Sequence, residues 1–182
     1  MRKLICLIVL IGFLSTTALA EENTVWKSSN FDGTIQINKN FRYVGSKDKS
    51  NKHIDRKYFV YDAGNGTIFY VLEIKLKGSR TWAADYDPVL GRAQNPTDPM
   101  LISHQPNDYA VWKDMSKDTY KTLKSMEVEL SKCRIITQRA EISPSRKSGF
   151  WATLITPSTC KNSQAEIDDA LDTYNKLLKV NS

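Results

Sequence analysis

The chain has 182 residues, of which 41% are hydrophobic and 25% charged, and its formal net charge is +6. A chain of this length can bury one sizeable core, which favours a single domain. The positive charge is mixed along the sequence without a basic stripe or an aromatic–basic motif, so we expect no nucleic-acid binding and only a mild preference for anionic partners.

The first 20 residues have the pattern of a cleavable signal peptide. Arg2 and Lys3 give a positive start, residues 4–14 form an apolar run, and residues 18–20 provide a small-residue cleavage site before Glu21. The apolar run is shorter than the ~20 residues that span a bilayer, which makes a permanent membrane anchor the weaker interpretation. We expect an exported protein, periplasmic in a Gram-negative cell and secreted otherwise.

Removal of this segment leaves residues 21–182, which we expect to form a single soluble α+β domain. Two of the 26 basic residues and none of the 20 acidic residues lie in the first 20 positions, which leaves 24 and 20. No second apolar run of membrane length follows. We therefore expect no stable membrane insertion after cleavage.

Two regions in the first half of the domain alternate like β-strands. In residues 34–44 the apolar side chains fall at odd positions, with a possible turn at residues 38–40. Residues 58–61 and 67–76 are rich in β-branched and aromatic side chains, and the Gly- and Asn-rich residues 62–66 predict a hairpin turn between them.

Residues 78–107 are predicted to form a long irregular loop, because they hold four of the six prolines and show no clear period. Loops longer than ~12–15 residues are uncommon in compact domains and are often functional. The aromatic and polar side chains in or beside this loop are the candidate partner-binding residues: Trp82, Asp85, Tyr86, Asp87, His104, Tyr109 and Trp112. In the alternative interpretation the aromatics fix the loop to the core, and residues 100–102 add an edge strand.

Motifs for metal, cofactor or nucleophilic chemistry are not found. Asp85 and Asp87 lack the further oxygen donors and the central glycine of a calcium loop, and His53 and His104 are too isolated to suggest zinc. No Gly-x-Ser-x-Gly elbow, phosphate-binding glycine loop or dinucleotide fingerprint occurs. We therefore expect no metal and no cofactor.

Two helices are predicted in the second half. Residues 115–130 carry a broad apolar face, with Asp114 or Ser116 as the cap. The last helix begins with a capping box, Ser163 followed three residues later by Glu166, and its apolar stripe continues to Leu178.

Cys133 and Cys160 are the two cysteines that remain after cleavage, and an exported chain favours their pairing. Residues 133–142 and 150–156 read as strands joined by the turn-rich residues 143–149. A hairpin centred on Arg146 and Lys147 places the two cysteines directly opposite each other, and the disulfide is worth about 3–4 kcal/mol in the chain-entropy model. A redox-active thiol is less favoured, because there is no Cys-x-x-Cys motif.

The elements together predict an α+β fold, in which an antiparallel β-sheet is packed by two helices on one side and carries one disulfide-clamped C-terminal hairpin. The function hypothesis is an exported, non-enzymatic binding domain that engages a protein partner. The alternative is a small cell-envelope hydrolase that uses the loop carboxylates Asp85 and Asp87 together with His104.

Overall fold

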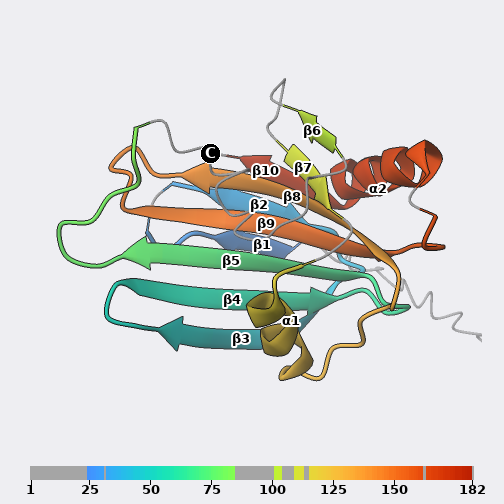
Figure 1. Cartoon of the computed structure of the whole chain (residues 1–182), viewed down its shortest axis with the longest axis horizontal. Helices are drawn as coiled ribbons and strands as arrows, with labels where there is room; N and C mark the ends of the chain where they lie inside the picture. Colours follow the sequence, from blue (N-terminus) through green and yellow to red (C-terminus); the bar gives the residue numbers. More distant parts are fainter. Residues whose placement is uncertain are drawn as a thin grey trace, which may run out of the picture.

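Figure 1 shows the computed structural model of the chain, which describes residues 24–30, 32–84, 101–103, 109–112, 115–161 and 163–181. The predicted signal segment, residues 1–20, therefore lies outside the described residues. In the described part the strands are β1 (Thr24–Lys27), β2 (Thr34–Ile37), β3 (Arg42–Ser50), β4 (Ile54–Asp62), β5 (Ile68–Leu76), β6 (Leu101–Ser103), β7 (Tyr109–Trp112), β8 (Arg134–Ile142), β9 (Ser148–Pro157) and β10 (Leu178–Asn181). The helices are α1 (Lys117–Lys124) and α2 (Gln164–Leu177).

The strands form two antiparallel sheets. The larger has seven strands in the order β3-β4-β5-β9-β8-β7-β6, and the smaller has three in the order β1-β2-β10. Strand β6 is an edge strand inside the segment predicted as an irregular loop, as the alternative interpretation of that segment expected. The α+β class predicted from the sequence is confirmed.

One face of the large sheet is covered by α1 and the segment that follows it. Side chains from alternate positions of β4, β5 and β9, such as Tyr58, Leu72 and Trp151, form a buried cluster with Leu123 of α1 and with Val128. In Figure 1, α1 lies in front of the large sheet.

The opposite face is covered by the small sheet and by α2. Trp26 and Ile35 of the small sheet pack with Phe69 and Phe150 of the large one, and Ile167 of α2 packs on β8. Because β5 and β9 contribute to both clusters, both strands are buried on both faces. The expectation that the helices share one side of the sheet is therefore wrong: the small sheet, whose strands are only four residues long, leaves space for α2 beside it.

The β4–β5 hairpin forms as predicted. Ala63 donates its N–H to the Thr67 carbonyl at 3.0 Å, and Thr67 donates to the Gly64 carbonyl at 2.9 Å. Asn65 and Gly66 both have positive φ, 47° and 80°, which a two-residue turn of this hand requires. A Cβ added to Gly66 would lie 2.5 Å from Ser131 Oγ, so this position has no room for a side chain.

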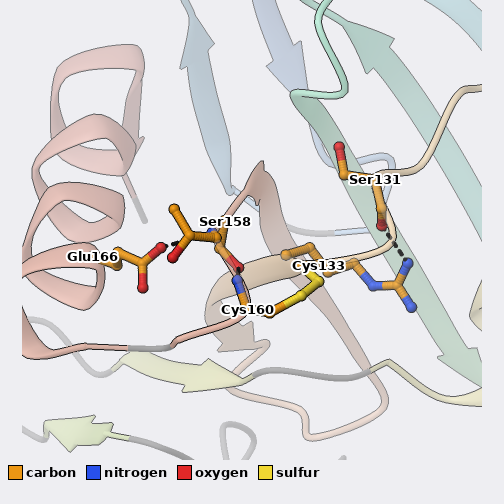
Figure 2. The surroundings of a disulfide bond; sticks show 7 residues. Ser131, Cys133, Ser158, Cys160 and Glu166 are labelled. Atoms are coloured by element: carbon orange, nitrogen blue, oxygen red, sulfur yellow. Dashed lines mark hydrogen bonds between the residues drawn. A yellow bond between two sulfur atoms is a disulfide. The ribbon is translucent and has the colours of Figure 1, made fainter.

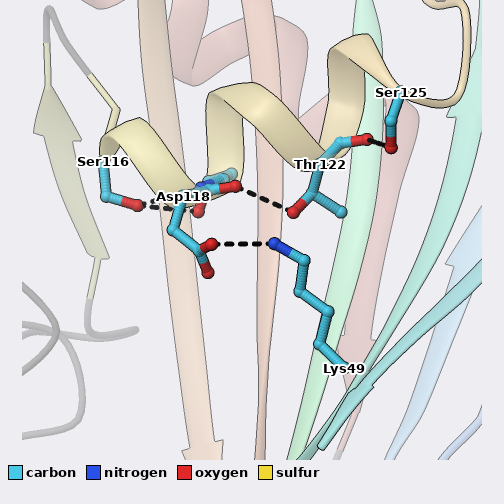
Figure 3. Close-up of polar contacts among 6 residues, drawn as sticks. Lys49, Ser116, Asp118, Thr122 and Ser125 are labelled. Carbon is cyan, nitrogen blue, oxygen red and sulfur yellow. Dashed lines mark hydrogen bonds and ion pairs between the residues drawn. The ribbon is translucent and has the colours of Figure 1, made fainter.

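Helix α1 is shorter than predicted. Ser116 is its cap and accepts a hydrogen bond from Thr119 N, but the helix ends at Lys124 rather than near residue 130. The Ser125 hydroxyl donates to the Thr122 carbonyl at 2.7 Å, and Glu127 has a positive φ of 60°, which stops the helix (Figure 3). The next apolar side chains, Met126, Val128 and Leu130, pack on the core from the turn and the irregular segment that follow the helix.

Helix α2 has the predicted capping box, with Ser163 and Glu166 each bonded to the backbone of the other. Its predicted stripe is buried at Ile167, Ala170 and Tyr174. The last predicted stripe residue, Leu178, is instead the first residue of β10, which pairs with β2.

The β8–β9 hairpin and its disulfide also form, but in a different register from the predicted one. Ser143 and Ser148 close a four-residue turn, so Ile142 faces Gly149 and Arg134 faces Pro157. Cys133 is therefore not directly opposite Cys160, because its carbonyl accepts from Ser158 N at 3.0 Å. Cys160 turns back with a positive φ of 71°, and its Cα lies 5.0 Å from that of Cys133 (Figure 2). The predicted pairing is confirmed, and the predicted geometry is wrong.

Candidate binding surface

Three chain segments meet at one end of the large sheet, on the left in Figure 1. They are the β3–β4 turn, the segment that follows β5, and the β8–β9 turn. Lys77 N donates to the His53 carbonyl at 2.9 Å, and Leu76 N donates to the Lys147 carbonyl at 2.8 Å. These backbone bonds fix the three segments to one another.

This end of the sheet gathers positive charge. Residues 47–57, 73–80 and 143–148 carry ten basic and three acidic side chains, an excess of seven. We call these residues the basic end. The basic side chains are Lys47, Lys49, Lys52, Arg56, Lys57, Lys75, Lys77, Arg80, Arg146 and Lys147, and the acidic ones are Asp48, Asp55 and Glu73. The other residues from Glu21 onward carry 14 basic and 17 acidic side chains, so the net positive charge of residues 21–182 comes from these three segments.

Several of these cations hold the local structure. Lys49 pairs with Asp118 of α1 at 2.7 Å (Figure 3), and Lys77 pairs with Asp55 at 2.8 Å. The Arg146 guanidinium donates to the carbonyls of Trp82 and Ala83. The remaining exposed cations, at positions 47, 52, 75, 80 and 147, make no ion pair with a described carboxylate and remain available to a ligand.

A buried carboxylate lies at the inner margin of the basic end. Glu73 is 4% exposed, on the face of β5 that carries the small sheet. One of its oxygens accepts from Ser28 Oγ at 2.6 Å and from Ser29 N at 2.9 Å, and the other accepts from Ser29 Oγ at 2.9 Å. Glu73 therefore fixes the β1–β2 loop against the large sheet. In the sequence, Glu73 is one of several charged residues on a partly exposed strand face, and no local pattern distinguishes it from the others.

Asp55 is the second carboxylate of this end with fixed partners. Its hydrogen bond from Lys77, with a further one from Ser50, holds the pKa of this carboxyl below its ordinary value. The side chain therefore stays ionised near neutral pH, and its charge is already matched by Lys77.

The structure describes three of the seven predicted site residues. Trp82 is half-buried and packs edge-on against Trp151 with the ring centroids 5.8 Å apart. Its backbone N–H donates to the Arg146 carbonyl at 2.9 Å. Tyr109 and Trp112 are the end residues of β7, opposite Arg139 and Ile136 of β8. The other four candidates, Asp85, Tyr86, Asp87 and His104, lie outside the described residues. Because these four are not described, the grouping of the seven candidates as one site stays a prediction.

The anchoring of Trp82 links the predicted loop to the basic end. Its contact with Trp151 places it in the core cluster on the α1 face, as the alternative interpretation of the loop aromatics expected. Residues 82 and 83 are bonded to the β8–β9 turn through Arg146. The chain thus enters the predicted binding loop from a fixed point on the basic end.

Near the disulfide, a hollow of about 340 Å³ lies between the end of β9 and the start of α2. Glu166 lines it, but one of its oxygens accepts from Thr159 N at 2.8 Å (Figure 2). The other oxygen accepts from Ser163 N at 3.1 Å. These backbone hydrogen bonds, the one from Thr159 first, hold the pKa of Glu166 below its ordinary value. Because its oxygens are used to cap the helix, this hollow offers little to a ligand.

In the described part of the chain, no group of three or more His, Cys, Asp or Glu side chains is arranged to hold a metal ion. No described helix is long and apolar enough to cross a bilayer. The hydrolase hypothesis depends on Asp85, Asp87 and His104, which are outside the described residues.

Comparison with known proteins adds no assignment: no protein-family model, curated protein or solved structure is significantly similar to this chain.

Proposed function

We propose that the protein is an exported binding domain without catalytic activity, and that it engages an acidic face of a protein partner through the basic end. The observation that carries the proposal is the excess of seven positive charges on three segments held together by backbone hydrogen bonds. A surface of one sign attracts and orients a partner of the opposite sign, and raises the association rate by 10–10³-fold.

A protein partner fits this surface better than a uniform polyanion. Two accessible carboxylates, Asp48 and Asp55, are interspersed among the cations, so a chain of evenly spaced negative charges would meet repulsion at those positions. A folded partner can instead match the mixed pattern with its own cations. The half-buried ring of Trp82 beside the cations adds an amphipathic contact of the kind enriched in protein interfaces.

Export is supported by the pairing of Cys133 with Cys160, because disulfides persist in oxidising compartments and are rare in the cytosol. The signal pattern of residues 1–20 points the same way.

The test compares three forms of the protein lacking residues 1–20 in cross-linking capture from the envelope and medium of its own cells. One form is the wild type, the second carries Lys52→Glu, Arg80→Glu and Lys147→Glu, and the third is a control of equal charge change. The control carries Lys39→Glu, Lys132→Glu and Lys161→Glu, exposed positions in turns at the opposite end of the sheet.

We expect the wild type and the control to capture the same protein, and the basic-end variant to lose it. The captured protein should also dissociate as salt rises, because exposed charges are screened over about 8 Å at physiological ionic strength. Equal recovery by all three forms would reject the basic end as the surface. Recovery of no protein by the wild type would reject the protein partner.

A further inference from the structure

A hollow of about 260 Å³ lies within the basic end, on the face of the large sheet that carries the small sheet. Its floor is formed by the ends of β3, β4 and β5, and one wall is the β1–β2 loop at Ser29 and Asn30. Strand register places one set of side chains on this floor: Asp48, Ser50, Asp55, Lys57, Glu73 and Lys75. The hollow is therefore lined by both signs of charge, and which charges are free decides what it can bind.

Two of its three carboxylates already have partners. Glu73 accepts three hydrogen bonds from Ser28 and Ser29, and Asp55 is held by Lys77 and Ser50. The third, Asp48, is exposed on the edge strand β3, so water solvates it at the outer rim. The interior of the hollow thus presents little unsatisfied negative charge.

The two lysines of the hollow, in contrast, have no partner of opposite charge: neither Lys57 nor Lys75 makes an ion pair with a carboxylate of the described residues. Lys57 faces Glu73 across the β4–β5 ladder, so Lys75 is its diagonal neighbour, about 7–8 Å away along the floor. The Lys57 ammonium lies over the ring of Phe59, 5.2 Å from its centroid. Phe59 is on the side of Lys57 away from Lys75, so this ammonium must turn to meet a ligand that both lysines hold.

We propose that Lys57 and Lys75 bind one carboxylate in this hollow. The inference rests on the proposed function, because the carboxylate is supplied by the acidic partner. The two lysine side chains start from neighbouring positions on the floor and are long and flexible, so both ammonium groups can turn to the space between them. There each can donate to one oxygen of a carboxylate in a charge-assisted hydrogen bond. A monoanion is favoured over a phosphate dianion, because the exposed carboxylate of Asp48 at the rim repels the second negative charge.

The probe is an N-acetylated, C-terminally amidated hexaglutamate peptide, titrated into the protein lacking residues 1–20 and followed by amide chemical shifts. The largest shifts are expected at Ser29, Asn30, Lys57 and Lys75. Acetylated hexaglutamine with a free C-terminus distinguishes a terminal from a side-chain carboxylate, and hexaglutamine amide serves as the uncharged control. Shifts that spare these four residues, or equal shifts with hexaglutamine amide, would overturn the proposal. Inorganic phosphate binding more tightly than acetate would overturn the preference for a monoanion.

The variant Lys57→Gln/Lys75→Gln should weaken hexaglutamate binding about tenfold, since each exposed charge pair contributes modestly. Lys39→Gln/Lys161→Gln, with the same charge change at the opposite end, should weaken it less than twofold. Lys75→Gln alone, at an exposed position that needs no repacking, should weaken it about threefold with an unchanged melting temperature. Equal effects of the two double variants would overturn the proposal.

The two sets of variants distinguish failure of the hollow from failure of the proposed function. If Lys52→Glu/Arg80→Glu/Lys147→Glu loses the partner while Lys57→Gln/Lys75→Gln retains it fully and also retains hexaglutamate binding, the hollow is rejected and the basic end stands. If the first variant retains the partner, the proposed function itself is rejected, whatever the peptide does.

Discussion

Replacing Glu73 tests whether one buried carboxylate holds the β1–β2 loop on the large sheet. Glu73→Ala removes an acceptor that receives three hydrogen bonds, from Ser28 Oγ, Ser29 N and Ser29 Oγ. A hydrogen bond to a charged group contributes ~1.5–3 kcal/mol, and part of this is recovered here because water can reach the two serines. We expect a loss of about 2–4 kcal/mol in the free energy of unfolding, a large fraction of the ~5–15 kcal/mol typical of a domain.

The assay is urea unfolding followed by tryptophan fluorescence, combined with hydrogen exchange at the Ser29 amide. Glu73→Gln keeps the size but offers one acceptor oxygen, so it should lose about half as much stability. Lys75→Gln, two residues along the same face of β5 and exposed, is the matched control and should change stability by less than about 0.5 kcal/mol. A Glu73→Ala protein with control-like stability and unchanged Ser29 exchange would refute the anchoring role.

Three further perturbations follow from the structure. Replacing Cys133 and Cys160 by serine should lower the free energy of unfolding by about 3–4 kcal/mol in urea titrations, from the loop of sequence separation 27, and an unreduced digest should show the two peptides linked. Ser163→Ala should lose about 1 kcal/mol, measured by thermal unfolding, because it removes half of the capping box with Glu166. Burial raises the pKa of Tyr61 to about 12, so the folded state keeps a proton that the unfolded state releases above its ordinary pKa of ~10. Stability should fall between about pH 10 and 12, and Tyr61→Phe should lessen that fall; equal slopes for both proteins would contradict it.

Local signals in the sequence were sufficient where neighbouring residues alone decide the structure. The capping box at Ser163 and Glu166 and the turn at residues 62–66 both form as predicted. In each case the hydrogen-bond partners lie within a few residues of one another, so no distant part of the chain can change the outcome.

The sequence was less successful where two structures satisfied the same local pattern. Met126 and Val128 fit a continuing helix, but the helix ends at Lys124, and both side chains reach the core from the turn and the irregular segment that follow it. The turn-rich residues 143–149 allowed more than one hairpin centre, and the observed register is fixed by the Ser143–Ser148 closure and the positive φ of Arg146. The disulfide between Cys133 and Cys160 still forms in the observed register, because Cys160 lies beyond the end of the strand, where the backbone can turn back.

The sequence by itself determined the α+β class, the two strands of the β8–β9 hairpin, the last helix and the cysteine pair. Only the tertiary structure decided where charge gathers, because residues 47–57, 73–80 and 143–148 are far apart along the chain and meet through the antiparallel strand order. The same long-range pairing buried Glu73 beneath the β1–β2 loop and left Lys57 and Lys75 in one hollow. Composition reports the total charge of a chain, whereas strand topology decides which charges become neighbours.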